Sequence, residues 1–333
     1  MKAMLHTAPV GLSGLSLGSK APRPPRKGEV QVRLKAAGLN HRDLFVMAAH
    51  RVDDPPLIPG SDGAGIVSQI GEEVSGISLG DEVVILPTLG WERTADVPTV
   101  PDIVGGPTDG TLAEYITLPA ANIFPKPSHL NWQEAAVLAL SGLTAYRALF
   151  TRGRLQRGDH VLLPGIGGGV ATFALLFALA AGATVTVSSR SPLKRREALR
   201  LGATTVLDSA DSWSGSDVSR PVDLVIDGIG QAMFDNYTQV LRPGGAIVIF
   251  GASSGDRLDV PIRDIFFPQH TILGTSMGSR EEFTQMLDWV NRHQLRPVVD
   301  SCYPLEQTPL AFERMASAEQ FGNLAIAVDV DGA

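Results

Sequence analysis

The chain has a single cysteine, Cys302, among its 333 residues. One thiol cannot form a disulfide within the chain, and it cannot build a site that needs several thiolates. A chain without disulfides suits a reducing compartment, so we expect a cytoplasmic protein. The opening residues are interrupted by Thr7, Pro9 and Gly11 before any apolar stretch develops, and we therefore predict no signal peptide.

Charged residues make up 19% of the chain and aromatic residues 6%, and no segment is a run of Lys and Arg. With a formal net charge of −7, the sequence lacks the basic patch that nucleic acids and anionic membranes attract. We expect a small molecule as its partner. The long uncharged stretch at residues 170–189 is split by Gly182, and its second part alternates β-branched residues. We predict a buried helix and then a strand there, rather than a membrane span.

Glycine and proline are abundant, with 35 and 23 residues, and 44% of the chain is hydrophobic, which is typical of an ordered protein with many turns. At about 150 residues per domain, the length predicts two domains. Up to about Pro125 the pattern is irregular and β-rich, with short strands expected at residues 29–39, 64–71 and 81–87. Residues 90–110, rich in Gly, Pro and Asp, are expected to form a surface loop or small lobe.

Beyond Asn131, short apolar runs alternate with helical stretches, and this alternation predicts an α/β fold with a doubly wound parallel sheet. The expected strands are residues 160–164, 183–187, 204–207, 222–227 and 246–251. The expected helices are residues 170–181, 192–202 and 231–245. An amphipathic helix at residues 281–293 and a final strand at residues 323–330 follow, and the apolar face of that helix consists of Phe283, Met286, Leu287 and Val290.

A glycine-rich segment, GIGGGVA at residues 165–171, follows the first of these strands and opens a helix. Glycines let the backbone turn tightly and approach a pyrophosphate, which the N–H groups of the helix N-terminus then bind. A glycine cluster alone is more often a plain turn, but its place between strand and helix favours a dinucleotide site. The residues assigned to phosphate binding are Gly165, Gly167, Gly168, Gly169 and Val170.

The end of the second strand indicates which dinucleotide binds. About 20 residues after the glycines, NAD-specific proteins place an acidic residue that binds the ribose hydroxyls. This chain has Ser188, Ser189 and Arg190 there, with Lys194 one turn later. Hydroxyl groups and cations suit a 2′-phosphate, so we predict NADPH as the cofactor. The alternative is that the cations of residues 190–196 form only the solvated face of a helix.

Small residues also end two later strands. Gly228, Gly251 and Ala252 follow predicted strands at their carboxyl ends, the edge where open α/β sheets bind ligands, and we assign them to the cofactor. Ordinary strand-to-helix turns would place glycines there as well. The neighbouring Asp227 is interpreted as a structural turn residue rather than a catalyst.

Six further segments occur in a specific order along the chain. They are AAGLNHRD at 36–43, PLIPGSDGAGIV at 56–67, GDEVV at 80–84, DGTLAEY at 109–115, ALSGLTAYRAL at 139–149 and RPGGAIVIFG at 242–251. With these motifs and the glycine loop, the chain resembles the medium-chain dehydrogenase/reductase superfamily over nearly its full length, in particular its zinc-free, quinone oxidoreductase-like branch.

The resemblance implies two domains with the active site in the cleft between them. A GroES-like β-rich substrate domain would comprise residues 1–125 and 268–333, and a Rossmann domain would comprise residues 126–267. It also implies a homo-oligomer, either a dimer or a tetramer.

The resemblance further bears on metal binding. Zinc-dependent relatives place a Cys at the position of Asn40, a His at that of Ser61 and a second Cys near Leu140 or Ser141. Catalytic zinc needs three protein ligands of suitable type, and none remains here. Residues 90–110 stand where those relatives carry four cysteines for structural zinc, and they contain none. We predict no metal.

An improvised metal site from His41, Asp43 and Asp62 matches no familiar ligand spacing. The two carboxylates are instead expected to stabilise the turn and the cleft wall.

The catalytic residues implied by the matching motifs are Asn40, Asp43, Ser61 and Thr144. Asn40 could hydrogen-bond the substrate or serve only as a turn residue. Many zinc-free relatives carry Tyr near the position of Phe45, which has no hydroxyl. Bulk water or Tyr146 would then have to donate a proton, although the helical pattern around Tyr146 favours burial.

A carbonyl that no zinc polarises is a poor hydride acceptor, so an intrinsically electrophilic substrate is favoured. We predict an NADPH-dependent oxidoreductase that reduces a quinone or an α,β-unsaturated carbonyl. The alternatives are a metal-free or zinc-type alcohol or aldehyde dehydrogenase-like enzyme, and a non-catalytic NADPH-binding protein.

Overall fold

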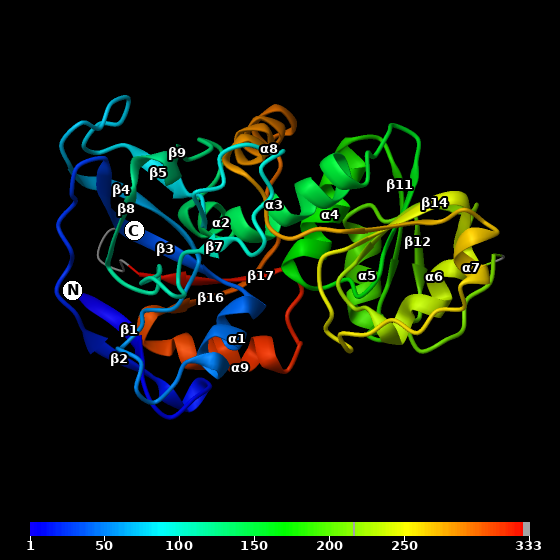
Figure 1. Ribbon diagram of the computed structural model, residues 1–333, viewed down its shortest axis with the longest axis horizontal. Helices are drawn as coiled ribbons and strands as arrows, with labels where there is room; N and C mark the ends of the chain where they lie inside the picture. Colours follow the sequence, from blue (N-terminus) through cyan, green and yellow to red (C-terminus); the bar gives the residue numbers. More distant parts are fainter. Residues whose placement is uncertain (216, 329–333) are drawn as a thin grey trace. The chain divides into compact units, whose positions relative to one another are not determined.

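The computed structural model describes residues 1–215 and 217–328, and Figure 1 shows the elements that they form. The chain divides into two compact units, one made of Met1–Ser141 with the chain from Gly278 onward, and one made of Gly142–Met277. The expected boundaries, after residues 125 and 267, both lie earlier. Helix α2 (Trp132–Ala136) stays with the first unit because it contacts that unit's sheet. The last strand of the second sheet, β15 (Thr271–Gly274), carries the second unit past residue 267.

The first unit contains a seven-stranded sheet in the order β16-β17-β3-β4-β5-β9, with β8 also paired to β3. Two-stranded sheets join β1 to β2 and β6 to β7. The strands are β1 (Lys2–His6), β2 (Leu15–Ser19), β3 (Glu29–Leu39), β4 (Asp62–Ile70), β5 (Glu82–Ile85), β6 (Thr88–Leu89), β7 (Asp102–Ile103), β8 (Tyr115–Pro119), β9 (Ile123–Pro125), β16 (Val299–Pro304) and β17 (Asn323–Ala327). The helices are η1 (Leu12–Gly14), α1 (His41–Ala49), η2 (Ala120–Asn122), α2, α8 (Arg280–His293), η5 (Leu305–Gln307) and α9 (Thr308–Ala316), and α3 (Ala139–Tyr146) begins here and ends in the second unit.

Alternating apolar residues explain this sheet. In β3, Val30, Val32 and Leu34 are fully buried and belong to one hydrophobic core. That core also receives Phe312 from α9, so both chain ends contribute to it. The expected strands at 29–39, 64–71 and 81–87 appear as β3, β4 and β5, and the amphipathic face expected for residues 281–293 is the buried face of α8. The final strand is β17, and expected strand residues 329 and 330 lie outside the described residues.

The second unit contains a six-stranded parallel sheet in the order β12-β11-β10-β13-β14-β15. Figure 1 shows α4 and α5 on one side of this sheet and α6 on the other, as in a doubly wound fold. The strands are β10 (His160–Leu163), β11 (Thr184–Ser188), β12 (Thr205–Leu207), β13 (Val222–Asp227), β14 (Leu241–Ile249) and β15. The helices are η3 (Arg147–Arg152), α4 (Gly169–Ala180), α5 (Pro192–Arg200), η4 (Gln231–Met233), α6 (Phe234–Val240) and α7 (Arg263–Phe266).

One expectation for the second unit needs correction. The helix expected at residues 231–245 ends at Val240, and β14 begins at Leu241. Pro243 lacks the N–H that a helix needs, and Gly244 has a left-handed φ of 73°, so neither can continue a helix. In the first unit, residues 90–110, expected as a surface loop or small lobe, contain β7, which pairs with β6.

The uncharged stretch at residues 170–189 forms most of α4 and then β11, as expected, and α4 is a buried helix of the second unit. Within the described residues, no helix combines the length and apolar character needed to cross a membrane.

Candidate functional site

The glycine loop joins the carboxyl end of β10 to the first turn of α4. Gly165 and Gly167 have φ values of 68° and 130°, which residues with a side chain rarely adopt. Gly168 is the N-cap of α4, and the space where its Cβ would stand is open to 4 Å. The first N–H groups of any helix lack acceptors within that helix. This loop therefore has the geometry of an anion site.

The carboxyl end of β11 contributes two buried hydroxyl groups. Ser188 accepts a hydrogen bond of 2.9 Å from the hydroxyl of Ser209, and its carbonyl accepts the Ile166 N–H at 2.8 Å, which ties β11 to the glycine loop. Ser189 Oγ accepts the Ser191 N–H at 3.1 Å. Ser189 Oγ accepts in that bond, so the bond does not use the hydrogen of its own hydroxyl group.

Two of the cations predicted near this strand end take different positions. The side chain of Lys194 lies over the glycine loop, since a Cβ built on Gly167 would stand 2.7 Å from Lys194 Cδ and 2.9 Å from Nζ. Arg190, by contrast, is exposed at the start of the following turn. Lys194 therefore places its ammonium group beside the phosphate-binding backbone, and the alternative of a purely solvated face does not describe it.

Arg195 also has a structural role on this helix. Its guanidinium donates to the Ser189 carbonyl and forms an ion pair of 2.6 Å with Asp208, which follows β12. The hydrogen bond from the Ala210 N–H keeps the pKa of Asp208 below its usual value, and the hydrogen bond from Arg195 lowers it further. Asp208, which directly precedes the Ser209 that bonds to Ser188, is thus already paired.

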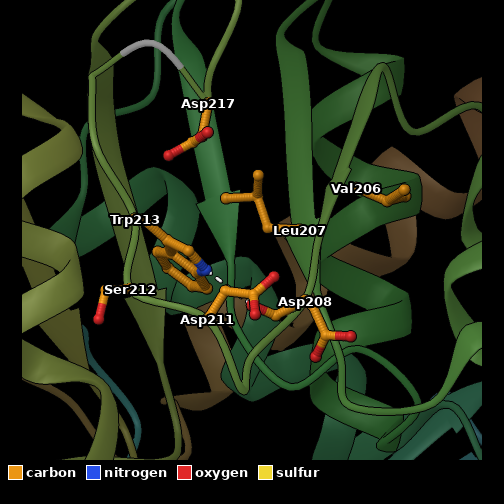
Figure 2. Close-up of a pocket in the computed structure, with 7 residues that line it drawn as sticks. All are labelled: Val206, Leu207, Asp208, Asp211, Ser212, Trp213 and Asp217. Atoms are coloured by element: carbon orange, nitrogen blue, oxygen red, sulfur yellow. Dashed lines mark hydrogen bonds between the residues drawn. The ribbon is translucent and has the colours of Figure 1, made fainter.

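Asp208 also lines a pocket formed by the end of β12 and the loop that follows it, shown in Figure 2. The Trp213 indole N–H donates to the Asp208 carbonyl at 2.8 Å and fixes the ring against the loop. The full lining is Val206, Leu207, Asp208, Asp211, Ser212, Trp213 and Asp217. Its several carboxylates make this pocket unsuitable for a phosphate group, so it does not compete with the glycine loop for that role.

The carboxyl ends of β13 and β14 complete the same edge of the sheet. Gly228 and Gly251 follow these strands, and their backbones lie side by side, since a Cβ built on Gly251 would stand 3.2 Å from the Gly228 carbonyl oxygen. A Cβ built on Gly228 would meet the Phe250 ring at 2.5 Å. Asp227 is fully buried and accepts hydrogen bonds from the Ile229 and Gly230 N–H groups. These bonds support its interpretation as a turn residue.

Tyr237 donates to Asp227 Oδ1 at 2.8 Å. Burial raises the pKa of Asp227, and these hydrogen bonds oppose that rise.

The predicted cofactor residues follow β10, β11, β13 and β14, which are parallel neighbours in one sheet. Their carboxyl ends lie at the same edge, so these residues share that edge, and Ala252 follows Gly251 there.

The first unit has a separate group of buried polar residues where β3 ends and α1 begins. Asn40 is the N-cap of α1, and its N–H donates to Asp43 Oδ2 at 2.8 Å. Ser61 donates to Asp43 Oδ1 at 3.4 Å and accepts from Arg42 at 3.1 Å. The predicted residues Asn40, Asp43 and Ser61 are thus joined in one network.

Asp62 extends this network to α3. Its Oδ1 accepts the Leu140 N–H at 2.8 Å, and its Oδ2 accepts the Asn40 side-chain N–H at 3.1 Å. Ser141 in turn donates to Asn40 Oδ1 at 3.3 Å. These side chains are at most 6% exposed, so the bonds form out of contact with bulk water.

Burial changes the charge of the two carboxyl groups. It raises the pKa of Asp43 to about 6, although the Asn40 N–H, Arg42 and Ser61 oppose the rise. It raises the pKa of Asp62 to about 7, and the nearby charge of Asp43 adds to that effect. At neutral pH, Asp62 is therefore close to half protonated, whereas Asp43 is mostly ionised.

We tested this network for its fit to a catalytic zinc ion. The positions that carry zinc ligands in zinc-dependent relatives hold an amide, two hydroxyls and an aliphatic side chain, in Asn40, Ser61, Ser141 and Leu140. These polar groups bond to one another and to Asp62 rather than converging on a shared point. Zinc prefers thiolate, imidazole and carboxylate ligands. The donor set does not fit the ion.

Three further positions considered for catalysis are Thr144, Tyr146 and Phe45. Thr144 is buried in the part of α3 that belongs to the second unit. Tyr146 packs its ring against Phe150, with ring centroids 4.9 Å apart. Phe45 is 71% exposed on α1, where a tyrosine hydroxyl would reach solvent.

Comparisons with known proteins match two separate segments of the chain. The family model of the alcohol dehydrogenase GroES-like domain matches residues 26–128, and that of the zinc-binding dehydrogenases matches residues 169–292. The zinc-type alcohol dehydrogenase-like protein YogA of Leptosphaeria maculans is 34% identical, over 91% of this chain and 92% of its own. This chain belongs to the medium-chain dehydrogenase/reductase superfamily.

Other members of the superfamily support the same conclusion. The crystal structure of an NAD-dependent alcohol dehydrogenase superposes with a TM-score of 0.93 and 33% identity, covering 99% of this chain and 100% of that one. The quinone oxidoreductase of Mus musculus is 28% identical over 87% of this chain and 86% of its own. The predicted Rossmann and GroES-like folds are confirmed. The protein is an oxidoreductase with a fold that binds nicotinamide dinucleotides.

Several contributors to the site were missed at the level of the sequence. Arg195, Ser209 and Asp208 cooperate at the end of β11, although β12 is separated from it by a whole helix. Ser141 was considered only as the place of a missing zinc ligand. The sequence did contain a signal for Asp208 and Ser209, because both directly follow a predicted strand. Residues at the carboxyl ends of parallel strands share one edge of the sheet.

Proposed function

We propose that this protein is an NADPH-dependent reductase of quinones or α,β-unsaturated carbonyls that works without zinc. The observation that carries the proposal is the end of β11, where the buried Ser188 and Ser189 are followed directly by the exposed Arg190, with Lys194 over Gly167 as a second cation of the site. NAD-specific proteins place a carboxylate at this strand end. Cations and hydroxyls there favour the extra phosphate of NADPH.

The neighbouring carboxylate supports this choice. Asp208 would repel a 2′-phosphate if it were unpaired, but Arg195 holds it at 2.6 Å. Binding of NADH is the competing possibility, because a superposable relative of 33% identity is an NAD-dependent alcohol dehydrogenase.

The donor set around Asn40 supports the zinc-free part of the proposal. Bound NADPH would supply the hydride. Without a Lewis acid, the favoured acceptors are those whose reduced forms spread the new negative charge over a conjugated system. We assign the amide of Asn40 and the hydroxyls of Ser61 and Thr144 to hydrogen bonding in that reaction, and Asp43 to positioning Asn40 and Ser61.

Asp62 contributes through its charge. An ionised carboxylate beside a developing anion would oppose the reaction, whereas its protonated form would not. Because the pKa of Asp62 is about 7, we expect kcat/KM for quinone or enone reduction to fall as the pH rises above neutral. The substitution Asp62→Asn, which mimics the protonated group, should remove this fall.

The cofactor assignment is tested by charge reversal on α5 and the turn before it. Arg190→Glu and Lys194→Glu should each weaken NADPH binding at least tenfold, because each removes a charge-assisted contact of about 1.5–3 kcal/mol. Arg190→Glu should change the binding of NADH by less than about twofold, whereas Lys194→Glu should weaken NADH as well, because Lys194 lies over the loop assigned to the pyrophosphate that both nucleotides contain. Arg196→Glu is the matched control, since Arg196 is an exposed cation of the same helix.

Fluorescence titration with both nucleotides measures these effects, and tighter binding of NADH than NADPH by the unmodified protein would refute the assignment. Oxidation of NADPH in the presence of quinones, enals, enones and simple aldehydes then tests the reaction. Activity with aldehydes alone would favour the dehydrogenase-like alternative. Binding without turnover on any acceptor would favour a non-catalytic protein.

Elemental analysis of the purified protein tests whether the enzyme works without zinc, because one zinc ion per chain would contradict the proposal.

The homo-oligomeric state also stays a prediction, and sedimentation velocity would measure it.

A further inference from the structure

Two histidines of the first unit meet in a way that the proposed reaction does not explain. His6 is the last residue of β1 and is fully buried, and His50 is the C-cap of α1. Their Nδ1 atoms lie 2.8 Å apart. The rings are tilted by 64°, with centroids 4.9 Å apart, so they meet edge to face rather than stacking.

The opposite nitrogens of both rings determine what can lie between them. His6 Nε2 is 2.8 Å from the Gly11 carbonyl oxygen, and His50 Nε2 is 3.1 Å from that of Pro55. A carbonyl oxygen only accepts, so each Nε2 must carry a hydrogen. A neutral imidazole has one N–H, and both Nδ1 atoms would then present bare lone pairs to each other. Two lone pairs at 2.8 Å repel, so the arrangement requires a positive charge between them.

The distance distinguishes a proton from a metal ion. A separation of 2.8 Å is that of a hydrogen bond. Zinc–nitrogen bonds of about 2.0–2.1 Å in a tetrahedral site would hold the two nitrogens roughly 3.3 Å apart. We propose that His6 and His50 share one proton, forming an imidazolium–imidazole pair that fastens the loop after α1 to the N-terminal strand.

The surroundings place the proton mainly on His50. The carbonyl groups at the end of α1 favour a cation at its C-cap. Burial lowers the pKa of His6, the bond to the Gly11 carbonyl opposes this, and the charge of His50 lowers it further. His6 is therefore the neutral acceptor and His50 the donor.

Other charged groups near the pair belong to three elements. The loop after His50 contains Arg51, Asp53 and Asp54. Strand β1 begins with Lys2, which pairs at 3.8 Å with Glu306 of η5, the element packed against β1. Helix η1, which contacts α1, contains no titratable side chain. Of these charged groups, His50 is the one whose charge lowers the pKa of His6.

The pair connects two loops through its outer nitrogens. Through Gly11, it reaches the segment whose N–H bonds to the Met47 carbonyl at 3.0 Å. Through Pro55, it reaches the segment that ends at Leu57, which exchanges two backbone hydrogen bonds with His6. The shared proton is thus the side-chain link between β1, the end of α1 and the loop of residues 51–56.

Two interacting sites lose their protons in two macroscopic steps. As the pH rises, the folded pair loses the shared proton, and the link is lost with it. The pair holds a second proton less tightly, because two cations would then face each other at 2.8 Å. The loop should therefore be most ordered over a window of pH and loosen on both sides of it.

Hydrogen exchange of the full-length protein, with amides of residues 51–57 resolved, tests this. Exchange in this segment should be slowest between the two steps and at least tenfold faster at high pH, after correction for the intrinsic pH dependence of exchange. In His50→Leu the protection should be lost at all pH values. In His50→Gln, whose amide can donate without titrating, it should no longer depend on pH. His129→Gln is the control, because His129 bonds to the Leu295 carbonyl at 2.9 Å elsewhere in the unit.

Nitrogen-15 NMR of the histidine side chains provides the second measurement. One averaged Nδ1–H signal shared by His6 and His50 supports the pair. Two Nδ1 atoms without a proton across the neutral range would overturn the proposal. A signal that changes after dialysis against a chelator would also overturn it, since a metal ion would then occupy the position of the proton.

Discussion

Replacing Asp62 by Asn should make the protein more stable than the unmodified chain at alkaline pH, although the substitution is in a buried network. The pKa of Asp62 is raised from 3.8 in an exposed group to about 7, because burial penalises the charged form. A raised pKa means that the folded state binds the proton more tightly than the unfolded state. The resulting stability is fully present below about pH 4 and is lost as the pH rises through 7.

The size of the effect follows from the shift. About three pKa units at roughly 1.4 kcal/mol each give a total near 4 kcal/mol, of which ~2–3 kcal/mol is lost between about pH 5 and pH 8. The Asp62→Asn variant keeps both partners, because the oxygen of the new amide can accept the Leu140 N–H and its N–H₂ can donate to a reoriented Asn40 amide. The free energy of unfolding of the variant should therefore lack this loss.

Urea denaturation of both proteins at about pH 5 and pH 8 measures the difference. Asp223→Asn is the matched control. Burial opposes ionisation of Asp223, but Arg242, the His160 N–H and Arg220 together lower its pKa. That variant should be less stable by a similar amount at both pH values. If Asp62→Asn also changes stability equally at both, Asp62 does not titrate between about pH 5 and pH 8, which contradicts its raised pKa.

Three other substitutions test the second unit. Gly167→Ala should weaken nucleotide binding at least tenfold, because its φ of 130° is strained for alanine and the new methyl would meet Lys194 at 2.7 Å. Gly168→Ala has open space in the protein, so thermal stability should hold while nucleotide affinity falls; unchanged affinity would contradict close approach of a pyrophosphate. Tyr237→Phe removes a donor from buried Asp227 and should cost about 1–3 kcal/mol in chemical denaturation. A larger loss of kcat than of stability would instead indicate a catalytic Asp227.

Much of the fold could be predicted from local patterns. Each expected parallel strand is a short apolar run, and its neighbours in sequence are helices, so the period of the pattern changes where the element changes. The prediction was wrong at residues 241–245, where a helix was extended across Pro243 into β14. It also missed β15, which is short and mostly exposed at one edge of its sheet and therefore has a weak apolar signal.

The candidate site was predicted less evenly. The glycine loop was recognisable because its function depends on backbone conformation, which glycine directly permits. Lys194 was recognised as a cation near the second strand, but not as one that lies over Gly167. Arg195 was considered only within the alternative of a solvated helix face, and the position of Asp208 explains its partial burial and its ion pair.

The sequence by itself determined the order of strands and helices, the glycine conformations of the cofactor loop and the replacement of zinc ligands by Asn40 and Ser61. These are properties of single residues or of short repeats. The tertiary structure decided the charges. Asp62 becomes a weak acid because the fold buries it, and the hydrogen bonds from Asn40 and Leu140, 22 and 78 positions away along the chain, only oppose that effect. His50 meets His6, a residue 44 positions away, through their Nδ1 atoms. A pKa depends on the groups that surround a side chain in space, and spacing along the chain does not record which groups those are.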